Sequence, residues 1–164
     1  CARLLETPAP ETPWEELNGF AVRRHRPSRQ LRPPSLFRSQ QEFVFFQAVR
    51  EVFPTYLVYP NVALSCLIDC ERLAEVLSEE ERRYALRALV DCAVFDPDDG
   101  YRPCYCFELD SPLHGTPERR QRDALKARIL QLAGLPLFCI RPPTGTVGRD
   151  AFVALLRRLF QQGV

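Results

Sequence analysis

The sequence predicts an α/β domain in which a mixed β-sheet of about four strands is flanked by helices. Two observations lead to this class. Apolar residues recur at helical spacing in some segments and form short strand-like runs in the segments between them. From residue 39 the expected order of elements is helix, strand, short helix, two strands, helix, strand and helix. Hydrophobic residues make up 46% of the 164 residues, which is enough to form a core.

Residues 1–35 are expected to form a linker or arm ahead of a domain over residues 36–164. This stretch contains six prolines and no sustained apolar period. It carries a basic cluster, which fits either a solvated linker or contact with nucleic acid or anionic lipid: Arg23, Arg24, His25, Arg26, Arg29 and Arg32. The formal charge of the chain is only +1, so a charged partner would have to be recognised by a local patch.

The first helix of the domain is expected over residues 40–53, with Ser39 as its cap and Pro54 as its stop. Its apolar side chains at helical spacing are Phe43, Phe46, Val49 and Phe53. The next segment, TYLVYPNVAL, is β-branched and aromatic, and it predicts a strand interrupted at Pro60. Residues 73–89 are polar enough for an exposed helix or a helical insertion.

Two apolar runs, 89–95 and 103–109, predict a β-hairpin because an Asp-Pro-Asp-Asp-Gly turn joins them. Thr116 and Pro117 are suited to open a helix that runs to residue 133 and ends at Gly134.

The segment LPLFCIRP predicts a short buried strand, and GRDAFVALLRRLFQQ predicts an amphipathic last helix. The face of that helix expected in the core consists of Phe152, Leu155, Leu156 and Leu159.

The cysteines and the hydropathy predict a cytoplasmic protein. The seven cysteines are an odd number and never occur as Cys-x-x-Cys, which favours reduced thiols over disulfides or a zinc ribbon. No stretch approaches the roughly 18 to 20 apolar residues of a membrane span, and no signal peptide is present. The sequence starts at Cys1 and lacks methionine, so we expect a piece of a longer protein, and the sequence does not show whether the part before Cys1 holds a membrane anchor.

Carboxylates gather at one end of the predicted hairpin. Strand alternation places Cys104, Cys106, Glu108 and Asp110 on one face. Pairing of residue 94 with residue 104 would set Asp91 opposite Phe107, next to Glu108. Such a cluster is costly unless a cation or a proton neutralises it, and Mg²⁺ or Mn²⁺ suits oxygen ligands. The alternative is that acids at a strand end are merely solvated.

Further polar residues follow directly. His114 in the next loop is placed to act as an acid, a base or an outer partner of the site. On the following helix, Arg119, Arg122, Asp123 and Lys126 share a broad face because residues three and four apart are neighbours. Lys126 is the only lysine beside 21 arginines, which suggests a need for a compact ammonium at a water or phosphate. A surface ion pair of Asp123 with Lys126 is the alternative.

In this order the residues resemble the PD-(D/E)XK, or restriction-endonuclease-like, nuclease superfamily. Within it the chain looks like the uncharacterised bacterial domain family DUF2726, a relative of the very-short-patch-repair type of endonuclease. The likeness covers about residues 36–141. The matching positions are Glu42, Asp91, Glu108 with Asp110, His114, Arg122-Asp123 with Lys126, and AGLP at 133–136.

The resemblance implies a restriction-endonuclease-like core and Mg²⁺- or Mn²⁺-dependent hydrolysis of phosphodiester bonds in nucleic acid, with DNA expected before RNA. Asp91 and Glu108 would hold the metal, with Glu42 and Asp110 as further ligands. Lys126 or His114 would position the attacking water. Arg119 and Arg122 would contact substrate phosphate.

Two departures from the family pattern leave alternatives open. Asp110 stands where the superfamily usually has a lysine, and Pro112 and Leu113 replace small polar residues in the loop. An inactive domain of the same fold that binds nucleic acid or a protein partner is therefore the second reading. A plain cytosolic interaction domain whose carboxylates lie on the surface is the third.

Overall fold

A computed structural model of the chain describes residues 15–23, 34–110 and 116–161. The chain divides into two compact units, residues 1–34 and 35–164. In the first unit, β1 (Glu15–Leu17) and β2 (Phe20–Val22) form an antiparallel hairpin. Asn18 and Gly19 turn the chain with φ of 51° and 81°, as a type I′ turn requires. The Asn-Gly pair signals this hairpin, which the interpretation of the segment as a linker missed.

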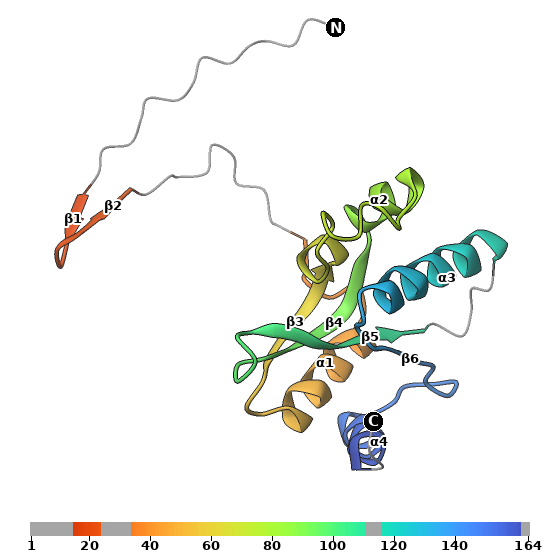
Figure 1. The fold of residues 1–164 in the computed structure, drawn as a ribbon. Coiled ribbons are helices and arrows are strands. Elements are labelled where there is room, and N and C mark those ends of the chain that lie inside the picture. Colours follow the sequence, from red (N-terminus) through yellow and green to blue (C-terminus); the bar gives the residue numbers. More distant parts are fainter. Residues whose placement is uncertain (1–14, 24–33, 111–115, 162–164) are drawn as a thin grey trace, which may run out of the picture. The chain divides into compact units, whose positions relative to one another are not determined.

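The second unit is built on a four-stranded sheet (Figure 1). Its strands are β3 (Leu57–Ala63), β4 (Leu89–Asp96), β5 (Arg102–Leu109) and β6 (Leu137–Ile140), in the order β3-β4-β5-β6. Neighbours among the first three are antiparallel, and β5 and β6 are parallel. The predicted mixed sheet of about four strands is therefore confirmed.

Side-chain caps mark the start of three of the helices. The helices are α1 (Gln40–Val52), the 3₁₀ turn η1 (Leu64–Cys66), α2 (Glu79–Ala85), α3 (Pro117–Leu132) and α4 (Arg149–Gln161). Ser39 accepts a hydrogen bond from the Glu42 backbone N–H, as predicted, and Thr116 accepts one from Arg119. Gly134 follows α3 with φ of 71°.

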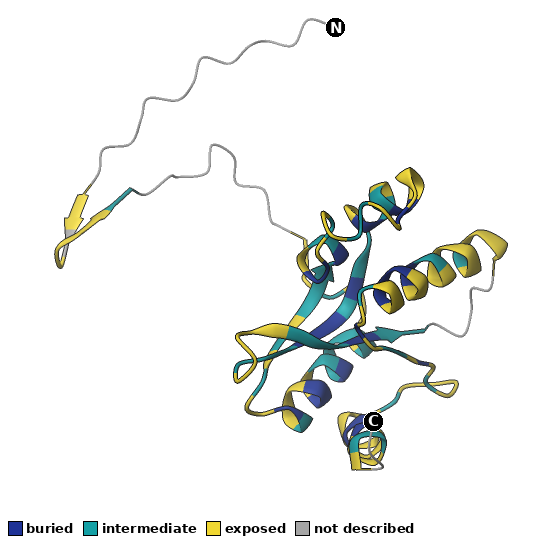
Figure 2. Cartoon of the chain, viewed as in Figure 1, coloured by how far each residue is buried: buried dark blue, intermediate teal, exposed yellow. Residues whose placement is uncertain are grey.

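Two hydrophobic cores cover the two faces of the sheet (Figures 1 and 2). On one face α1 and α4 pack over β4 and β5. The buried residues of that core include Phe45, Val49, Cys92, Val94, Phe107, Phe152 and Leu156. On the other face, α3 and the segment from η1 to α2 bury a second set, which includes Leu64, Ala85, Ala93, Cys106, Ile129 and Leu130. The candidate site lies on this second face.

Four local predictions differ from the structure, the first two in β3 and α2. β3 runs through Pro60, which pairs with Cys92; an edge strand tolerates proline, and the irregularity falls on Asn61, whose φ is 52°. The helix expected within 73–89 spans only α2, because Ser78 and Glu81 form a capping box that starts it.

The buried face of α4 is also rotated from the predicted one. Val153 is 5% exposed, whereas Leu155 is 39% exposed. The helix packs against both the sheet and α1, so its buried face includes Val153, which the three- and four-residue spacing used for the prediction left out.

A β-bulge sets the register of the central hairpin. Phe95 pairs with Pro103, but the register shifts by one before Val94, which pairs with Tyr105 rather than with residue 104 as predicted. Cys92 then pairs with Phe107, and continuing this register sets Asp91 opposite Glu108. Opposed residues share a face of a sheet, so the bulge turns both carboxylates toward α3.

Among the residues that the structure describes, no helix combines the length and the apolar character needed to cross a membrane.

We expect Phe107→Ala to lower the free energy of unfolding by about 3–5 kcal/mol, because truncation leaves a cavity in a close-packed core. Phe107 is fully buried, and its ring lies 5.4 Å from that of Phe138 and 6.0 Å from that of Phe45. Urea unfolding measures the loss. Leu86→Ala is the control, since Leu86 is 65% exposed and should change stability by no more than about 0.5 kcal/mol. Equal losses for the two variants would contradict this packing.

Candidate active site

One polar cleft of about 920 Å³ collects most of the residues singled out in the sequence. Residues before and at the start of α1, the end of α2, the strands β4 and β5, and α3 as far as Lys126 form its walls. The charged side chains that line it are Arg38, Glu42, Arg87, Asp91, Glu108, Arg119, Arg122, Asp123 and Lys126. The cleft thus draws on segments far apart in the sequence.

Asp91 and Glu108 form the acidic centre of the cleft. The Asp91 Oδ2 atom accepts a hydrogen bond of 2.8 Å from the Leu109 backbone N–H, which fixes its carboxylate against β5. The Glu108 Oε1 atom accepts one of 2.6 Å from the Lys126 ammonium. Among the described residues, Asp91 Oδ1 and Glu108 Oε2 have no hydrogen-bond donor. Each carboxylate therefore keeps one oxygen for another ligand.

Lys126 is held in place by the docking of α3. Ile129 and Leu130, one turn further along, are fully buried against the sheet. This leaves only 8% of Lys126 exposed, with its ammonium on Glu108. The alternative of a surface ion pair between Lys126 and Asp123 is not formed, since the ammonium bonds to Glu108 on the sheet instead.

The Glu108 carboxyl group loses its proton less readily here than it would in water. Burial raises its pKa, and the negative charge of Asp91 raises it further, whereas Lys126 lowers it; the result is a pKa of about 7. Proton uptake near neutrality is one response to two carboxylates in a partly buried site. A bound cation is the other.

Glu42 reaches the same cleft from the first turn of α1. Its Oε2 atom accepts a hydrogen bond of 2.8 Å from the Arg38 backbone N–H, so part of its role is to cap the helix. Its carboxylate also lies where the helix dipole favours a negative charge.

Of the predicted residues, Asp110 stands apart from this group. Asp110 does not line the cleft; its carboxylate pairs with Arg141 at 3.0 Å. His114 lies outside the described residues. Within residues 15–23, 34–110 and 116–161, no three His, Cys, Asp or Glu side chains gather closely enough to hold a metal ion by themselves.

The arginines of the cleft differ from most others in the described parts of the chain. Eight arginines elsewhere form ion pairs with carboxylates: Arg72, Arg82, Arg83, Arg102, Arg128, Arg141, Arg149 and Arg157. In the same described residues, none of the four that line the cleft, Arg38, Arg87, Arg119 and Arg122, has a carboxylate partner. Arg87 and Arg122 each donate one Nε–H to a backbone carbonyl oxygen of their own segment, and the remaining N–H groups are available to an anion.

Arg38, Tyr84 and Arg87 line the cleft but were not predicted from the sequence. Tyr84 and Arg87 belong to a segment that reads as an exposed helix. Only the packing of α2 beside α3, where Arg128 pairs with Glu81 at 2.7 Å, brings them to the site. The chain has 21 arginines, so the presence of an arginine could not mark Arg38 or Arg87 as site residues.

We expect the Glu108 carboxyl carbon to titrate with a midpoint near 7 in a ¹³C NMR titration of the chain. Asp91→Asn should lower that midpoint, because it removes a negative charge while its side-chain oxygen can still accept from Leu109. Asp110→Asn is the matched control and should leave the midpoint in place, since Asp110 pairs with Arg141. An unchanged midpoint in Asp91→Asn would contradict the proximity of the two carboxylates.

Comparison with known proteins places the second unit in a family. The family model described as "Protein of unknown function (DUF2726)" matches residues 35–152. No curated protein and no solved structure was found to match the chain. The matched segment contains the sheet, the helices α1 to α3 and the start of α4, and thus the whole cleft. The chain therefore belongs to the DUF2726 family.

Proposed function

We propose that the chain is a metal-dependent nuclease domain of the PD-(D/E)XK type, which hydrolyses phosphodiester bonds in nucleic acid. One observation carries the proposal. The carboxylates of Asp91 and Glu108, with those of Glu42 and Asp123, line a single cleft together with the only lysine and with four arginines that have no carboxylate partner among the described residues. Carboxylates to hold a divalent ion, an ammonium to position water and arginines to bind phosphate are the groups that this hydrolysis requires.

The residues present suit Mg²⁺ or Mn²⁺. Such ions are commonly bound by one or two carboxylates, with water and substrate phosphate as the other ligands. Asp91 and Glu108 each keep one oxygen without a donor among the described residues. Glu42 would complete the site directly or through water. A bound ion would polarise the phosphate and stabilise the charge that develops on it.

Lys126 is the residue that we assign to the attacking water. Its ammonium lies 2.6 Å from Glu108, so it stands beside the proposed metal ligands with two N–H groups left for water or phosphate. Arg119 and Arg122, on the same face of α3, would hold the phosphate. The water oxygen bonds to phosphorus as the ester P–O bond breaks, one product ends in a phosphate, and the leaving oxygen gains a proton as a hydroxyl.

The second candidate function is binding without cleavage, to nucleic acid or to a protein partner. Two observations favour it. Asp110 occupies the position of the usual lysine and pairs with Arg141 outside the cleft, and the Lys126 ammonium is already bonded to Glu108. Under this hypothesis the pair would neutralise the site permanently.

Glu108→Gln, Asp91→Asn and Lys126→Met should each lower Mg²⁺- or Mn²⁺-dependent cleavage of single- and double-stranded DNA at least about 100-fold, because each removes a group that acts on the reacting atoms. Gel-resolved cleavage of labelled oligonucleotides measures the rates, and circular dichroism checks the fold.

Asp110→Asn is the control for that series, since Asp110 lies outside the cleft, and it should cleave like the unchanged chain. A wild-type chain that cleaves neither DNA nor RNA with either ion would overturn the nuclease and leave the binding function.

Mn²⁺ should bind the wild-type chain, as measured by calorimetry, and Asp91→Asn should bind it at least tenfold more weakly because one anionic ligand is lost. Binding should tighten as the pH rises through 7, since the ion competes with the proton on Glu108. Equal affinity in the wild type and in Asp91→Asn would rule out this cleft as the metal site.

A further inference from the structure

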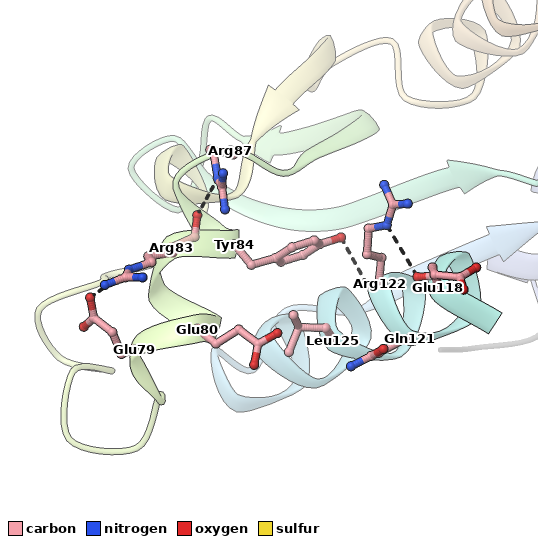
Figure 3. Close-up of a pocket in the computed structure, with 9 residues that line it drawn as sticks. All are labelled: Glu79, Glu80, Arg83, Tyr84, Arg87, Glu118, Gln121, Arg122 and Leu125. Carbon is pink, nitrogen blue, oxygen red and sulfur yellow. Dashed lines mark hydrogen bonds and ion pairs between the residues drawn. The ribbon is translucent and has the colours of Figure 1, made fainter. Parts of the chain in front are cut away.

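A second hollow of about 580 Å³ adjoins the polar cleft on its α2 side. Side chains of α2 and α3 line it, together with Arg87 just beyond α2 (Figure 3): Glu79, Glu80, Arg83, Tyr84, Arg87, Glu118, Gln121, Arg122 and Leu125. Tyr84, Arg87 and Arg122 line both the hollow and the cleft. The two spaces are therefore neighbours, and these three side chains form their common border.

Tyr84 is the central residue of this border. Its side chain extends from α2 toward α3, and its hydroxyl donates a hydrogen bond of 3.0 Å to the Arg122 carbonyl oxygen (Figure 3). The packing of the ring against the second core fixes its position, and the bond adds to this. A fixed aromatic ring at the edge of a cleft is a platform on which a nucleobase can stack.

The charges differ between the two spaces. The hollow is lined by three arginines and three glutamates, and one of these glutamates, Glu79, is paired with Arg82 and Arg83. It holds no surplus of positive charge for phosphate, but it offers the tyrosine ring and Leu125 as apolar surface. The cleft has its arginines without carboxylate partners among the described residues. Phosphate suits the cleft, and an uncharged aromatic group suits the hollow.

We propose that the hollow is a subsite for one unpaired base of a single-stranded nucleic acid. The base stacks on Tyr84, and Arg87 and Arg122 hold the adjoining phosphate at the border with the cleft. A base can enter only if it is not stacked and paired within a duplex, so the substrate class is single-stranded DNA or RNA, or an unpaired stretch. This inference rests on the proposed function, since it places the strand beside Asp91 and Glu108.

The test is the binding of fluorescein-labelled single-stranded DNA and RNA of one sequence to the full chain, followed by anisotropy in EDTA so that no cleavage intervenes. Tyr84→Leu should weaken binding about 5- to 150-fold, the loss typical of one base–aromatic stack. Tyr84→Phe keeps the ring and loses only the hydrogen bond to Arg122, so it should bind within about twofold of the wild type.

The salt dependence separates stacking from charge. Arg87→Gln should reduce the slope of log K against log salt by about 0.7, the value for one phosphate contact on a single strand. Tyr84→Leu should leave that slope unchanged, and the matched duplex should bind more weakly than either single strand.

Three results would overturn the subsite: wild-type affinity in Tyr84→Leu, equal losses in Tyr84→Leu and Tyr84→Phe, or no binding of either single strand by the wild type. Failure of the nuclease is distinguishable from these, because a wild-type chain that binds through Tyr84 but does not cleave with Mg²⁺ retains the subsite without the chemistry.

Discussion

The hydrogen-bonded ion pair between Glu108 and Lys126 is the interaction on which the cleft depends. It joins β5 to α3 at 2.6 Å, with little of either side chain exposed. Removing two charges from water is costly, and an unpaired partner left there would cost several kcal/mol. Ile129 and Leu130 dock α3 by burial against the sheet, and the pair adds a polar bond that is satisfied only in this arrangement. Because α3 also carries Arg119, Arg122 and Asp123, the same docking positions that whole wall of the cleft.

The fold followed from local signals that packing did not override. Ser39, Thr116 and Gly134 mark helix ends by hydrogen bonds or by backbone conformation within a few residues, and such signals can be read directly from a sequence. The bulge between Val94 and Phe95 leaves no comparable signal. A shift of one residue moves a side chain to the other face of a sheet, so the predicted register would have set Asp91 on the face opposite Glu108. The sequence analysis expected Asp91 and Glu108 to lie close together, but it did so from a pairing of residue 94 with residue 104 that the structure does not contain.

The residues of the site could be predicted where several of them lie on one helix or strand. They could not be predicted where the packing of two elements brings them together. The face of α3 could be drawn from helical spacing, and Arg119, Arg122 and Lys126 all line the cleft. Tyr84 and Arg87 arrive through the packing of α2 against α3, which depends on contacts such as Glu81 with Arg128 that spacing within one segment cannot reveal. Asp110 differs for a similar reason, since its partner, Arg141, is 31 positions away just beyond β6.

The identity of residue 126 follows from the physical demands of its place. An arginine there would bring five N–H donors on a broad planar group into a site where only 8% of the residue is exposed. A lysine brings three donors on a compact head, so one can bond to Glu108 while the others stay within reach of water in the cleft. In a chain with 21 arginines, burial against Glu108 thus favours a lysine at this one position. The same compactness suits an ammonium that orients water, so the structural requirement and the proposed catalytic one select the same side chain.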